Sequence, residues 1–334
     1  MIRRLILFGI AMVWFTFLYA CGSDSAESKD SERKTTTLKL AHSGSESHQY
    51  HIAAEKFKEL VEEKSKSLKI EIHPNSTLGS EGEVIEQVIS GSVDMTTVAA
   101  DSALANTVPE MNLFGIPYVF KDEKHVYKVL DGEIGADLLK LTEDKNMKGL
   151  GFWEVGFRHI TNDETEIKKP EDVKGLKIRV QPAPVWENHM KTLGANPTPV
   201  DFSELFSALD QGVINGQENP LATIDSMKFY EVQKHLALTA HTYTPAVVLM
   251  SLEKWDRLSE EEQSVIKQAV DETATYQREY LADKEEEIKS KLKENGVTIT
   301  EPDRELFREV TIKVKDEVAD DTQKELINRI DKEK

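Results

Sequence analysis

The pattern of hydrophobic and polar residues switches repeatedly between the period of a strand and the period of a helix from residue 37 onward. Residues 37–43 and 68–74 alternate apolar and polar positions, which predicts two half-buried strands. Residues 51–67 place their apolar side chains on one face of a helix. A helix, a glycine turn and a buried strand are predicted within 79–100. Strands that alternate with helices in this order are typical of an α/β sheet.

The same rhythm begins again at Arg158, which predicts a second α/β lobe. Between the two series we expect a buried crossing segment at 113–120, a helix at 125–146 and a strand at 149–157. The second series has expected elements at 175–181, 184–195, 198–214, 215–220 and 244–251. A folded body of roughly 300 residues also exceeds a typical single domain, so two lobes are the expected organisation.

One long helix is predicted at 259–295, where helix-forming residues continue without a break. Ser259 followed by Glu262 fits a capping box, and Gly296 fits a C-terminal stop. A helix of this length can span two lobes. The charged tail that follows is expected to form a further outer helix. We therefore expect lobe I to comprise 37–156 and 246–285, and lobe II to comprise 157–245 and 286–334.

Residues 1–20 are predicted to be a secretory signal peptide, because two arginines precede an apolar run that ends with a small residue. The following Cys21 is the only cysteine, and the sequence LYAC resembles a bacterial lipobox, in which the cysteine becomes lipid-modified. Residues 21–36 are polar and lack periodicity, as in a flexible tether. We expect an extracytoplasmic, lipid-anchored protein. The alternative is an uncleaved membrane anchor, for which the apolar run is barely long enough.

The formal net charge of −18 argues against nucleic acid as a partner, because phosphates require a basic surface. The sequence contains no P-loop, no dinucleotide-binding glycine motif, no HExxH and no Gly-x-Ser-x-Gly motif. His42, His48 and His51 are close in sequence, but no cysteine or matching acidic pair accompanies them at a zinc-binding spacing. We expect no metal, no cofactor and no catalysis.

Two arginines and one asparagine follow predicted strands. Arg158 follows WEVGF, Arg179 ends LKIR and Asn219 lies in NGQENP. Open α/β sheets bind ligands at the carboxyl ends of their strands, and a guanidinium offers a carboxylate two parallel hydrogen bonds that a lysine cannot copy. A lone arginine at a strand end is more simply explained by an exposed salt bridge. Three such residues at three strand ends favour a site for an organic anion.

Four segments of the chain resemble the solute-binding proteins of TRAP transporters (tripartite ATP-independent periplasmic transporters), the DctP family. They are GFRHITN, GLKIRV, residues 194–220 and KFYEVQKHLALTAH. The similarity extends from about Leu38 beyond Trp255. It implies a periplasmic-binding-protein-like fold, with two α/β lobes around a deep cleft and a long helix across both. It also implies that the protein captures a small organic anion and delivers it to a sodium-driven membrane permease.

The resemblance also implies roles for individual residues of lobe II. Arg179 is similar to the family's chief carboxylate-binding arginine, and Arg158 to a second arginine that contacts the ligand. Asn219 resembles a side-chain amide donor to the same carboxylate. Glu218 resembles a residue that meets polar substituents, although it could instead only cap the turn. Phe202 matches an aromatic residue of the pocket floor, with plain core packing as the alternative.

Fewer residues of lobe I are implied. Glu81 corresponds to an acidic residue that contacts distal polar groups in some family members. Ala99 falls where the sialic-acid-binding branch carries a glutamate, which counts against sialic acid. Further residues on segments that border the cleft in relatives are Ser43, Gln49, Trp153, Gln181, Trp186 and Tyr243.

These residues favour a sugar acid, such as a uronate or an aldonate, as the ligand. A C4-dicarboxylate is the alternative, but it would prefer another cation at the distal end, where none is evident. Two other functional classes stay open: a module that presents its closed form to a membrane receptor, and an extracytoplasmic enzyme that acts on an anionic sugar. We expect a monomeric binding protein.

Overall fold

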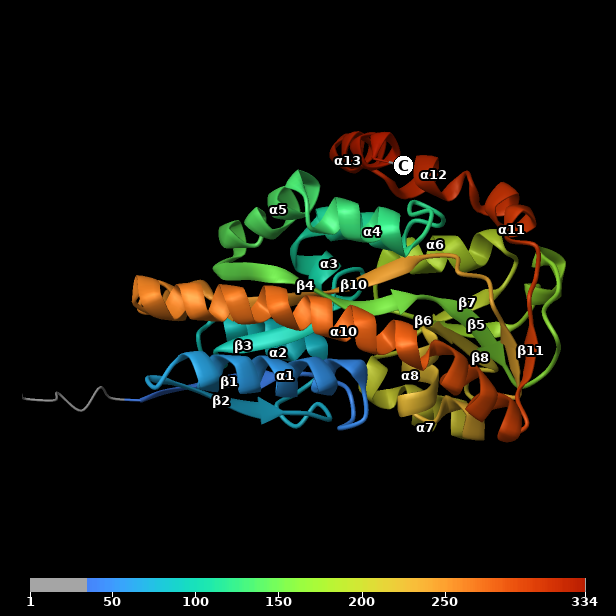
Figure 1. Ribbon diagram of the computed structural model, residues 1–334. Coiled ribbons are helices and arrows are strands. Elements are labelled where there is room, and N and C mark those ends of the chain that lie inside the picture. The colour runs from blue at the N-terminus through green and yellow to red at the C-terminus, as the bar shows by residue number, and fades with distance from the viewer. Residues whose placement is uncertain (1–34, 334) are drawn as a thin grey trace, which may run out of the picture. The chain divides into compact units, whose positions relative to one another are not determined.

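The computed structural model describes residues 35–333 (Figure 1). The predicted signal peptide, Cys21 and nearly all of the predicted tether lie outside the described residues. Strands and helices alternate along the described part of the chain and form two sheets. Within that part, no helix combines the length and the apolar character needed to cross a bilayer.

The first sheet belongs to lobe I and has five strands. From one edge to the other they are β2 (Leu68–His73), β1 (Thr36–Ala41), β3 (Met95–Ala99), β10 (Tyr243–Ser251) and β4 (Met147–Phe157). The first three pair in parallel, whereas β10 runs antiparallel to both of its neighbours. Val247 and Leu249 of β10 pack into one apolar cluster and Val248 and Met250 into another, because successive side chains point to opposite faces. Both faces of this sheet are therefore covered.

Helices of lobe I supply the two covers. One face carries α1 (Gln49–Lys64) and α10 (Glu260–Glu294), and the other carries α2 (Glu81–Ile89), α3 (Ala103–Thr107), α4 (Glu123–Leu130) and α5 (Glu133–Lys140). The prediction of one helix at 125–146 is wrong, because the chain turns between α4 and α5. Gly135 permits this packing, since a Cβ there would lie 1.9 Å from the carbonyl oxygen of Leu130. The predicted crossing at 113–120 begins in a 3₁₀ helix, Pro109–Gly115.

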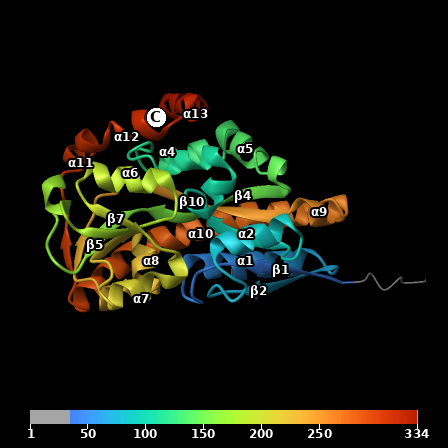
Figure 2. The same cartoon turned by 180° about the vertical axis from the view of Figure 1, so that it is seen from behind.

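The second sheet belongs to lobe II and has six strands. They are β11 (Thr298–Thr300), β9 (His235–Ala237), β5 (His159–Asn162), β8 (Gly216–Asn219), β6 (Lys177–Val180) and β7 (Asn196–Pro199). The helix α6 (Pro184–Thr192) contributes to one apolar cluster, and α7 (Leu205–Asp210) and α8 (Leu221–Ser226) contribute to another. The backbone crosses between the lobes from β4 to β5 and from β9 to β10 (Figure 2).

The long helix α10 agrees with its prediction at both ends. Ser259 and Glu262 form the capping box, in which the Ser259 hydroxyl accepts from the backbone N–H of Glu262 at 3.3 Å. Gly296 follows the helix with a positive φ of 83°. The first part of α10 packs on α1 and β4, and the last part buries Ile288 and Leu292 in an apolar cluster of lobe II. The helix therefore crosses both lobes (Figure 1).

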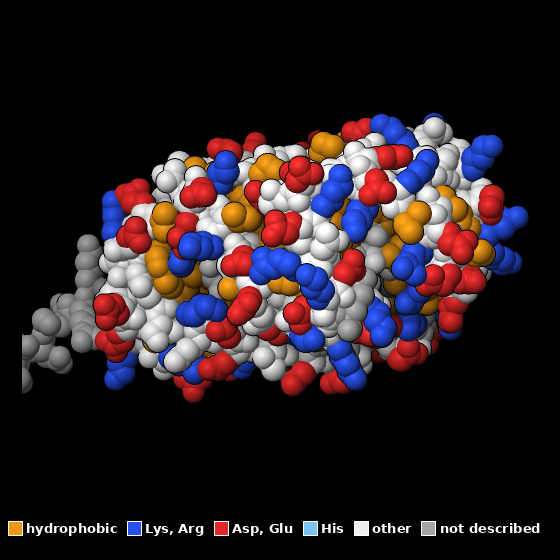
Figure 3. Space-filling view, turned by 90° about the horizontal axis from the view of Figure 1, so that it is seen from above, with side chains coloured by type: hydrophobic (Ala, Val, Ile, Leu, Met, Phe, Trp, Pro, Cys, Tyr) orange, Lys and Arg blue, Asp and Glu red, His pale blue; other side chains and the backbone are white. Residues whose placement is uncertain are grey.

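The tail contains three helices in place of the single helix that was expected. They are α11 (Arg304–Thr311), α12 (Val314–Val318) and α13 (Asp321–Lys332); a short helix α9 (Leu252–Trp255) precedes α10. Contacts of α11 and α12 are with α6 of lobe II, whereas α13 packs on α5 and on the 3₁₀ helix of lobe I. The assignment of 286–334 to lobe II therefore does not hold for α13. Acidic and basic side chains are interspersed on this upper face (Figure 3).

Candidate ligand-binding cleft

A narrow cleft lies between the two lobes, and most of the residues expected from the sequence line it. Lobe I contributes Ser43, His48, Tyr50, Glu81, Ala99, Ser102 and Val155, and lobe II contributes Arg158, Arg179, Gln181, Phe202, Asn219 and Thr223. Arg158 directly follows β4 of the first sheet. Arg179 is the last residue but one of β6 in the second sheet, so both lie near the end of a strand, as the sequence indicated. All the cations among these lining residues come from lobe II.

Arg158 is 2% exposed and is paired on every side by the protein. Its Nε and Nη2 donate to the two carboxylate oxygens of Glu218 at 2.5 and 2.9 Å, which is a bidentate ion pair. Nη2 also donates to the backbone oxygen of Glu218 at 2.7 Å and to Oδ1 of Asn219 at 3.1 Å. The indole ring of Trp186 lies 5.2 Å from the guanidinium carbon. The charge of Arg158 is therefore compensated inside the fold.

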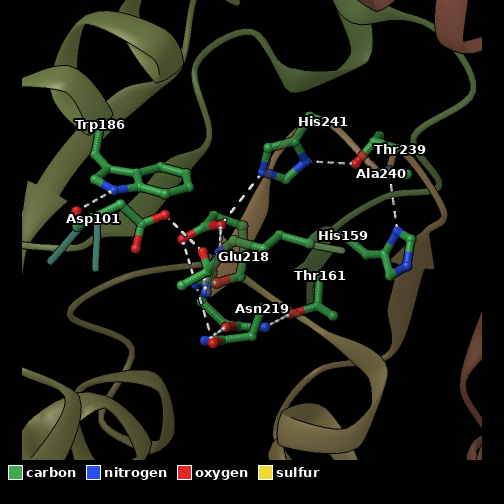
Figure 4. A network of polar contacts seen from close by, with 12 residues as sticks. Asp101, His159, Thr161, Trp186, Glu218, Asn219, Thr239, Ala240 and His241 are labelled. Atoms are coloured by element: carbon green, nitrogen blue, oxygen red, sulfur yellow. Dashed lines mark hydrogen bonds and ion pairs between the residues drawn. The ribbon is translucent and has the colours of Figure 1, made fainter. Parts of the chain in front are cut away.

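Glu218 is fully buried and stays ionised in this network (Figure 4). Burial alone would raise its pKa, but the charge of Arg158 and hydrogen bonds from His241 and Arg158 lower the pKa below its usual value. His241 places Nε2 at 3.3 Å from Glu218 and Nδ1 at 2.7 Å from the Thr239 hydroxyl. Because an ionised carboxylate only accepts, Nε2 of His241 donates and Nδ1 accepts. Glu218 therefore acts behind the cleft, through Arg158.

Arg179 is also 2% exposed, but its surroundings differ. Its Nε donates to the backbone oxygen of Val200 at 2.8 Å, and its Nη atoms have no hydrogen-bond partner among residues 35–333. Burial lowers the pKa of Arg179 to about 10; the charge of Glu218 acts against this, repulsion by Arg158 adds to it, and Glu81 and Asp201 oppose it more weakly. The end of this guanidinium lines the cleft. No carboxylate among residues 35–333 forms a salt bridge with Arg179.

Asn219 lies beside the two arginines on β8. Its Oδ1 is held by Arg158, and Nδ2 donates to Oε1 of Gln217 at 2.5 Å. Gln217 is fixed in turn, because its Nε2 donates to the hydroxyl of Thr161 at 2.7 Å. An amide nitrogen carries two hydrogens, so Nδ2 of Asn219 keeps one for the cleft that the residue lines.

The lobe I wall carries an acid where lobe II carries cations. Glu81 is the first residue of α2 and accepts from the Ser43 hydroxyl at 3.0 Å. Burial raises the pKa of Glu81 to about 7, although Ser43, Arg179 and Ser102 act in the opposite direction. Near neutral pH this carboxyl group can therefore donate or accept a hydrogen bond.

Sequence reasoning missed His48, Tyr50, Ser102, Val155 and Thr223, which also line the cleft. His48 caps α1, because its Nδ1 accepts from the backbone N–H of Tyr50 at 3.1 Å. Burial lowers the pKa of His48 to about 3, so the ring is neutral and carries its proton on Nε2. The sequence offered no clear signal for His48, because it lies three residues before the helix predicted at 51–67 and histidine is not among the preferred N-cap residues.

Some expected residues lie outside the lining. Trp186 is fully buried and donates from its indole to the backbone oxygen of Asp101 at 2.9 Å. Trp153 packs on Phe57 and donates to the oxygen of Val270 at 3.2 Å, in the core of lobe I. Three further expected residues also lie outside the lining, namely Gln49, Glu218 and Tyr243. Gln49 donates to the Thr223 hydroxyl at 2.7 Å and so joins the lobes.

The histidines near the start of the chain do not form a metal site in the described structure. Nε2 of His42 lies 3.2 Å from Nδ1 of His51, which is a hydrogen-bonded contact. Within residues 35–333, no three side chains of the His, Cys, Asp and Glu types are grouped so that they could hold a metal ion.

Comparison with known proteins gives matches along most of the chain. A family model described as bacterial extracellular solute-binding protein, family 7 (DctP), matches residues 40–321. The 2,3-diketo-L-gulonate-binding periplasmic protein YiaO of Escherichia coli strain K12 is 39% identical over 273 residues, which cover 81% of this chain and 83% of that protein.

Solved structures give the same result. One match is a TRAP periplasmic solute binding protein from Polaromonas sp. JS666, bound to D-erythronate. Its TM-score is 0.85 at 39% sequence identity, and the match covers 88% of this chain and 98% of that protein's chain. Another is the sugar acid binding protein DctPAm from Advenella mimigardefordensis strain DPN7T, in complex with galactonate. Its TM-score is 0.86 at 36% sequence identity, and the match covers 90% of this chain and 99% of that protein's chain. These similarities confirm the predicted fold class.

Proposed function

This chain belongs to family 7 of the bacterial extracellular solute-binding proteins, the DctP family, and we propose that it captures a sugar acid by closing its cleft around the ligand. It is a solute-binding protein of a TRAP transporter, a ligand-binding transport protein and not an enzyme. Its partner is accordingly a membrane permease, and it works outside the cytoplasm. The class of ligand and the residues that hold it are our proposal.

The single observation that carries the proposal is the unpaired end of Arg179. Leaving a guanidinium buried without a counter-ion is unfavourable. A ligand carboxylate that pairs with both Nη atoms would replace the hydrogen bonds to water that the guanidinium lost on burial. Asn219 would donate its remaining amide hydrogen to the same carboxylate. Arg158 contributes charge to the site, but its hydrogen bonds are already committed to Glu218 and Asn219.

The rest of the cleft favours hydroxyl groups over a second carboxylate. Glu81, Ser43 and Ser102 from lobe I and Gln181 from lobe II can exchange hydrogen bonds with hydroxyls. Nε2 of Gln181 is buried with no partner among residues 35–333, so a ligand oxygen would satisfy it. A second carboxylate would meet Glu81 and no cation of lobe I. Relatives whose names mention D-erythronate, galactonate and 2,3-diketo-L-gulonate support the same class.

Closure follows from where the opposing groups lie. Arg179 and Asn219 belong to lobe II, and Glu81 and Ser43 belong to lobe I, so a ligand of suitable length contacts both lobes only when they approach. The removal of water strengthens the ion pair at Arg179. Ligand therefore favours the closed form, because its contacts are better there. The permease then receives a closed, loaded protein.

We also propose that Cys21 is lipid-modified and that the body is a monomer. Cys21 lies outside the described residues, and the support is the apolar run that ends in LYAC. Replacing Cys21 with Ser should release the protein from the membrane fraction, and intact-mass measurement should show the loss of the acyl groups. A wild-type mass without acyl groups on Cys21 would contradict lipid anchoring. Light scattering of the soluble body tests the monomer.

A thermal-shift experiment tests the ligand class. The panel contains galactonate, galacturonate and erythronate as sugar acids, succinate as a C4-dicarboxylate and galactose as an uncharged control. A ligand that binds only the folded form at about a hundredfold excess over its Kd stabilises that form by about 2.7 kcal/mol. We expect at least one sugar acid to raise the melting temperature more than succinate does, and galactose to have no effect. A larger shift with succinate would contradict the proposal.

A further inference from the structure

A second and larger cavity lies on the other side of the interlobe crossing. It is a groove of about 640 Å³, whereas the cleft has about 20 Å³. Arg158 lines the cleft and His159, the next residue, lines the groove, because successive residues on an extended segment point to opposite sides. The walls of the groove come from α4 and β4 of lobe I, from α8 and strand ends of lobe II, and from the crossing helix α10.

Two largely buried polar side chains that line the groove each have one atom without a partner among residues 35–333. Glu154 and His159 are each 7% exposed. Oε2 of Glu154 accepts from the Tyr127 hydroxyl at 2.9 Å, and Oε1 has no donor among residues 35–333. Nδ1 of His159 accepts from the backbone N–H of Ala240 at 3.1 Å, so the proton of the neutral ring is on Nε2, which has no acceptor in the described chain. The two unpartnered atoms belong to residues that line the groove, so a ligand of matching polarity can take the place of water on both.

The charges around the two groups have opposite signs. Glu123 and Glu285 lie near Glu154, and Arg278 is already in a bidentate pair with Asp131 at 2.7 and 2.9 Å. Lys121 and Lys124 also line the groove. These surroundings suit a cationic hydrogen-bond donor.

The cations near His159 are Lys289 and Arg304, together with Arg158 on the far side of the strand. Lys289 is paired with Glu285 and Glu286, but Arg304 makes no ion pair among residues 35–333. Phe157 and Leu281 provide apolar surface in the same groove. The groove therefore has an acidic end, an apolar part and a basic end.

We propose that this groove binds a small zwitterion with an apolar body, whose ammonium group contacts Glu154 and whose carboxylate contacts His159 and Arg304. Glu154 is in β4 of lobe I and His159 is in β5 of lobe II, and Gly156 between them has a φ of 118°, which only glycine adopts readily. The zwitterion therefore bridges the two lobes across their connection.

Binding in the groove is coupled to solute binding in the cleft. The two cavities lie on opposite sides of the same crossing, so a rotation that narrows the cleft widens the groove. A zwitterion that fills the wide groove favours the closed form, and the solute favours the same form. By thermodynamic linkage each ligand raises the affinity of the other by the same factor.

Calorimetry with three matched probes tests the site. The probes are ε-aminocaproate, caproate, which lacks the ammonium group, and hexylamine, which lacks the carboxylate. Each probe is titrated into the wild-type protein saturated with galactonate and into the Arg179→Lys variant. Both conditions prevent binding of a probe carboxylate to Arg179 from contributing to the signal. We expect ε-aminocaproate to bind at least about tenfold more tightly than either partial probe. Equal affinities for the three probes, or no binding, would overturn the proposal.

Variants assign the two ends of the groove. Glu154→Gln and Arg304→Gln should each weaken ε-aminocaproate binding at least about fivefold, whereas Glu294→Gln, exposed at the end of α10, should not change it. Arg304 is exposed, so its variant remains informative if Glu154→Gln does not fold. Saturating ε-aminocaproate should also raise the affinity for galactonate by about fivefold. Unchanged binding in both variants would contradict the site, and an unchanged galactonate affinity would contradict the coupling.

Discussion

Arg158 and Arg179 are on the same wall of the cleft, equally buried, but the fold compensates only one of them. Arg158 has a bidentate partner in Glu218, further bonds to β8 and an indole ring against its face. Arg179 has one backbone oxygen, that of Val200, and a pKa lowered to about 10. One pKa unit corresponds to about 1.36 kcal/mol, so burial of this charge costs the unliganded protein on the order of 3 kcal/mol.

The difference separates stability from binding. A charge that the protein neutralises supports the fold and positions its neighbours, and its loss should be seen in unfolding. A charge that the protein leaves uncompensated destabilises the unliganded state and is available to a ligand. We therefore propose that Arg158 is part of the scaffold of the site and that Arg179 recognises the carboxylate of the ligand.

The largest effect is expected at the partner of Arg158. Glu218→Gln leaves the buried guanidinium without its counter-ion, which should lower the free energy of unfolding by about 3–5 kcal/mol. Urea unfolding of the unliganded protein measures this change. Glu204→Gln, an exposed acid in the same lobe, should change it by less than about 0.5 kcal/mol. Equal stability of the two variants would show that Arg158 does not depend on Glu218.

A smaller effect is expected on the opposite wall, where Glu81 faces the free end of Arg179. Glu81→Gln removes the like charge that a second carboxylate would meet, so at about pH 8, where Glu81 is ionised, succinate should bind about tenfold more tightly. Galactonate should change less, because a glutamine side chain still exchanges hydrogen bonds with hydroxyls. Calorimetry with both ligands checks the difference. Glu86→Gln, exposed on the same helix, is the matched control, and an unchanged preference in Glu81→Gln would contradict the role of Glu81.

The pH dependence of this preference should be smaller still. The pKa of Glu81 is raised from 4.5 to about 7, so the group is mostly neutral at about pH 6 and mostly ionised at about pH 8. The affinity for succinate relative to galactonate should therefore fall severalfold as the pH rises across this range. Since the folded state holds the extra proton between the two pKa values, the contribution of Glu81 to stability also falls as the pH rises. A ratio with the same pH dependence in Glu81→Gln would contradict this account.

The smallest effect is expected two residues before Arg179. Lys177 is on the same strand but exposed, and it does not line the cleft. Lys177→Ala should change galactonate affinity by less than about twofold, because an exposed charge is screened by solvent. A tenfold loss in calorimetry would show that the charge of the strand, and not the position of one guanidinium, controls binding.

Much of the fold was predictable because its signals are local. The capping box at Ser259 and the glycine after α10 defined the long helix from a few neighbouring residues. The break between α4 and α5 was missed, because the apolar spacing continues across the turn at Asp131 and Gly132. The packing of α13 on lobe I could not be predicted from the sequence either, because α13 contacts α5 only through tertiary packing.

The candidate site was predictable as a set of residues but not as a set of roles. Arg158 and Arg179 look alike in the sequence, since both follow strand-like segments. What separates them is the antiparallel pairing of β5 and β8, which places Asn219 opposite His159 and Glu218 opposite Ile160, next to Arg158. Trp153 and Tyr243 were expected at the cleft because their segments border it in relatives, but a segment alone does not tell which face of a strand meets a ligand.

The central claim, that Arg179 is the carboxylate receptor, is tested most directly by Arg179→Lys. Lysine keeps the charge but loses the two-pronged geometry, so galactonate binding should weaken by at least about tenfold in isothermal titration calorimetry. The free energy of unfolding of the unliganded variant should stay equal to or above that of the wild type. Near-wild-type affinity, or a loss of affinity that only accompanies unfolding, would contradict the claim.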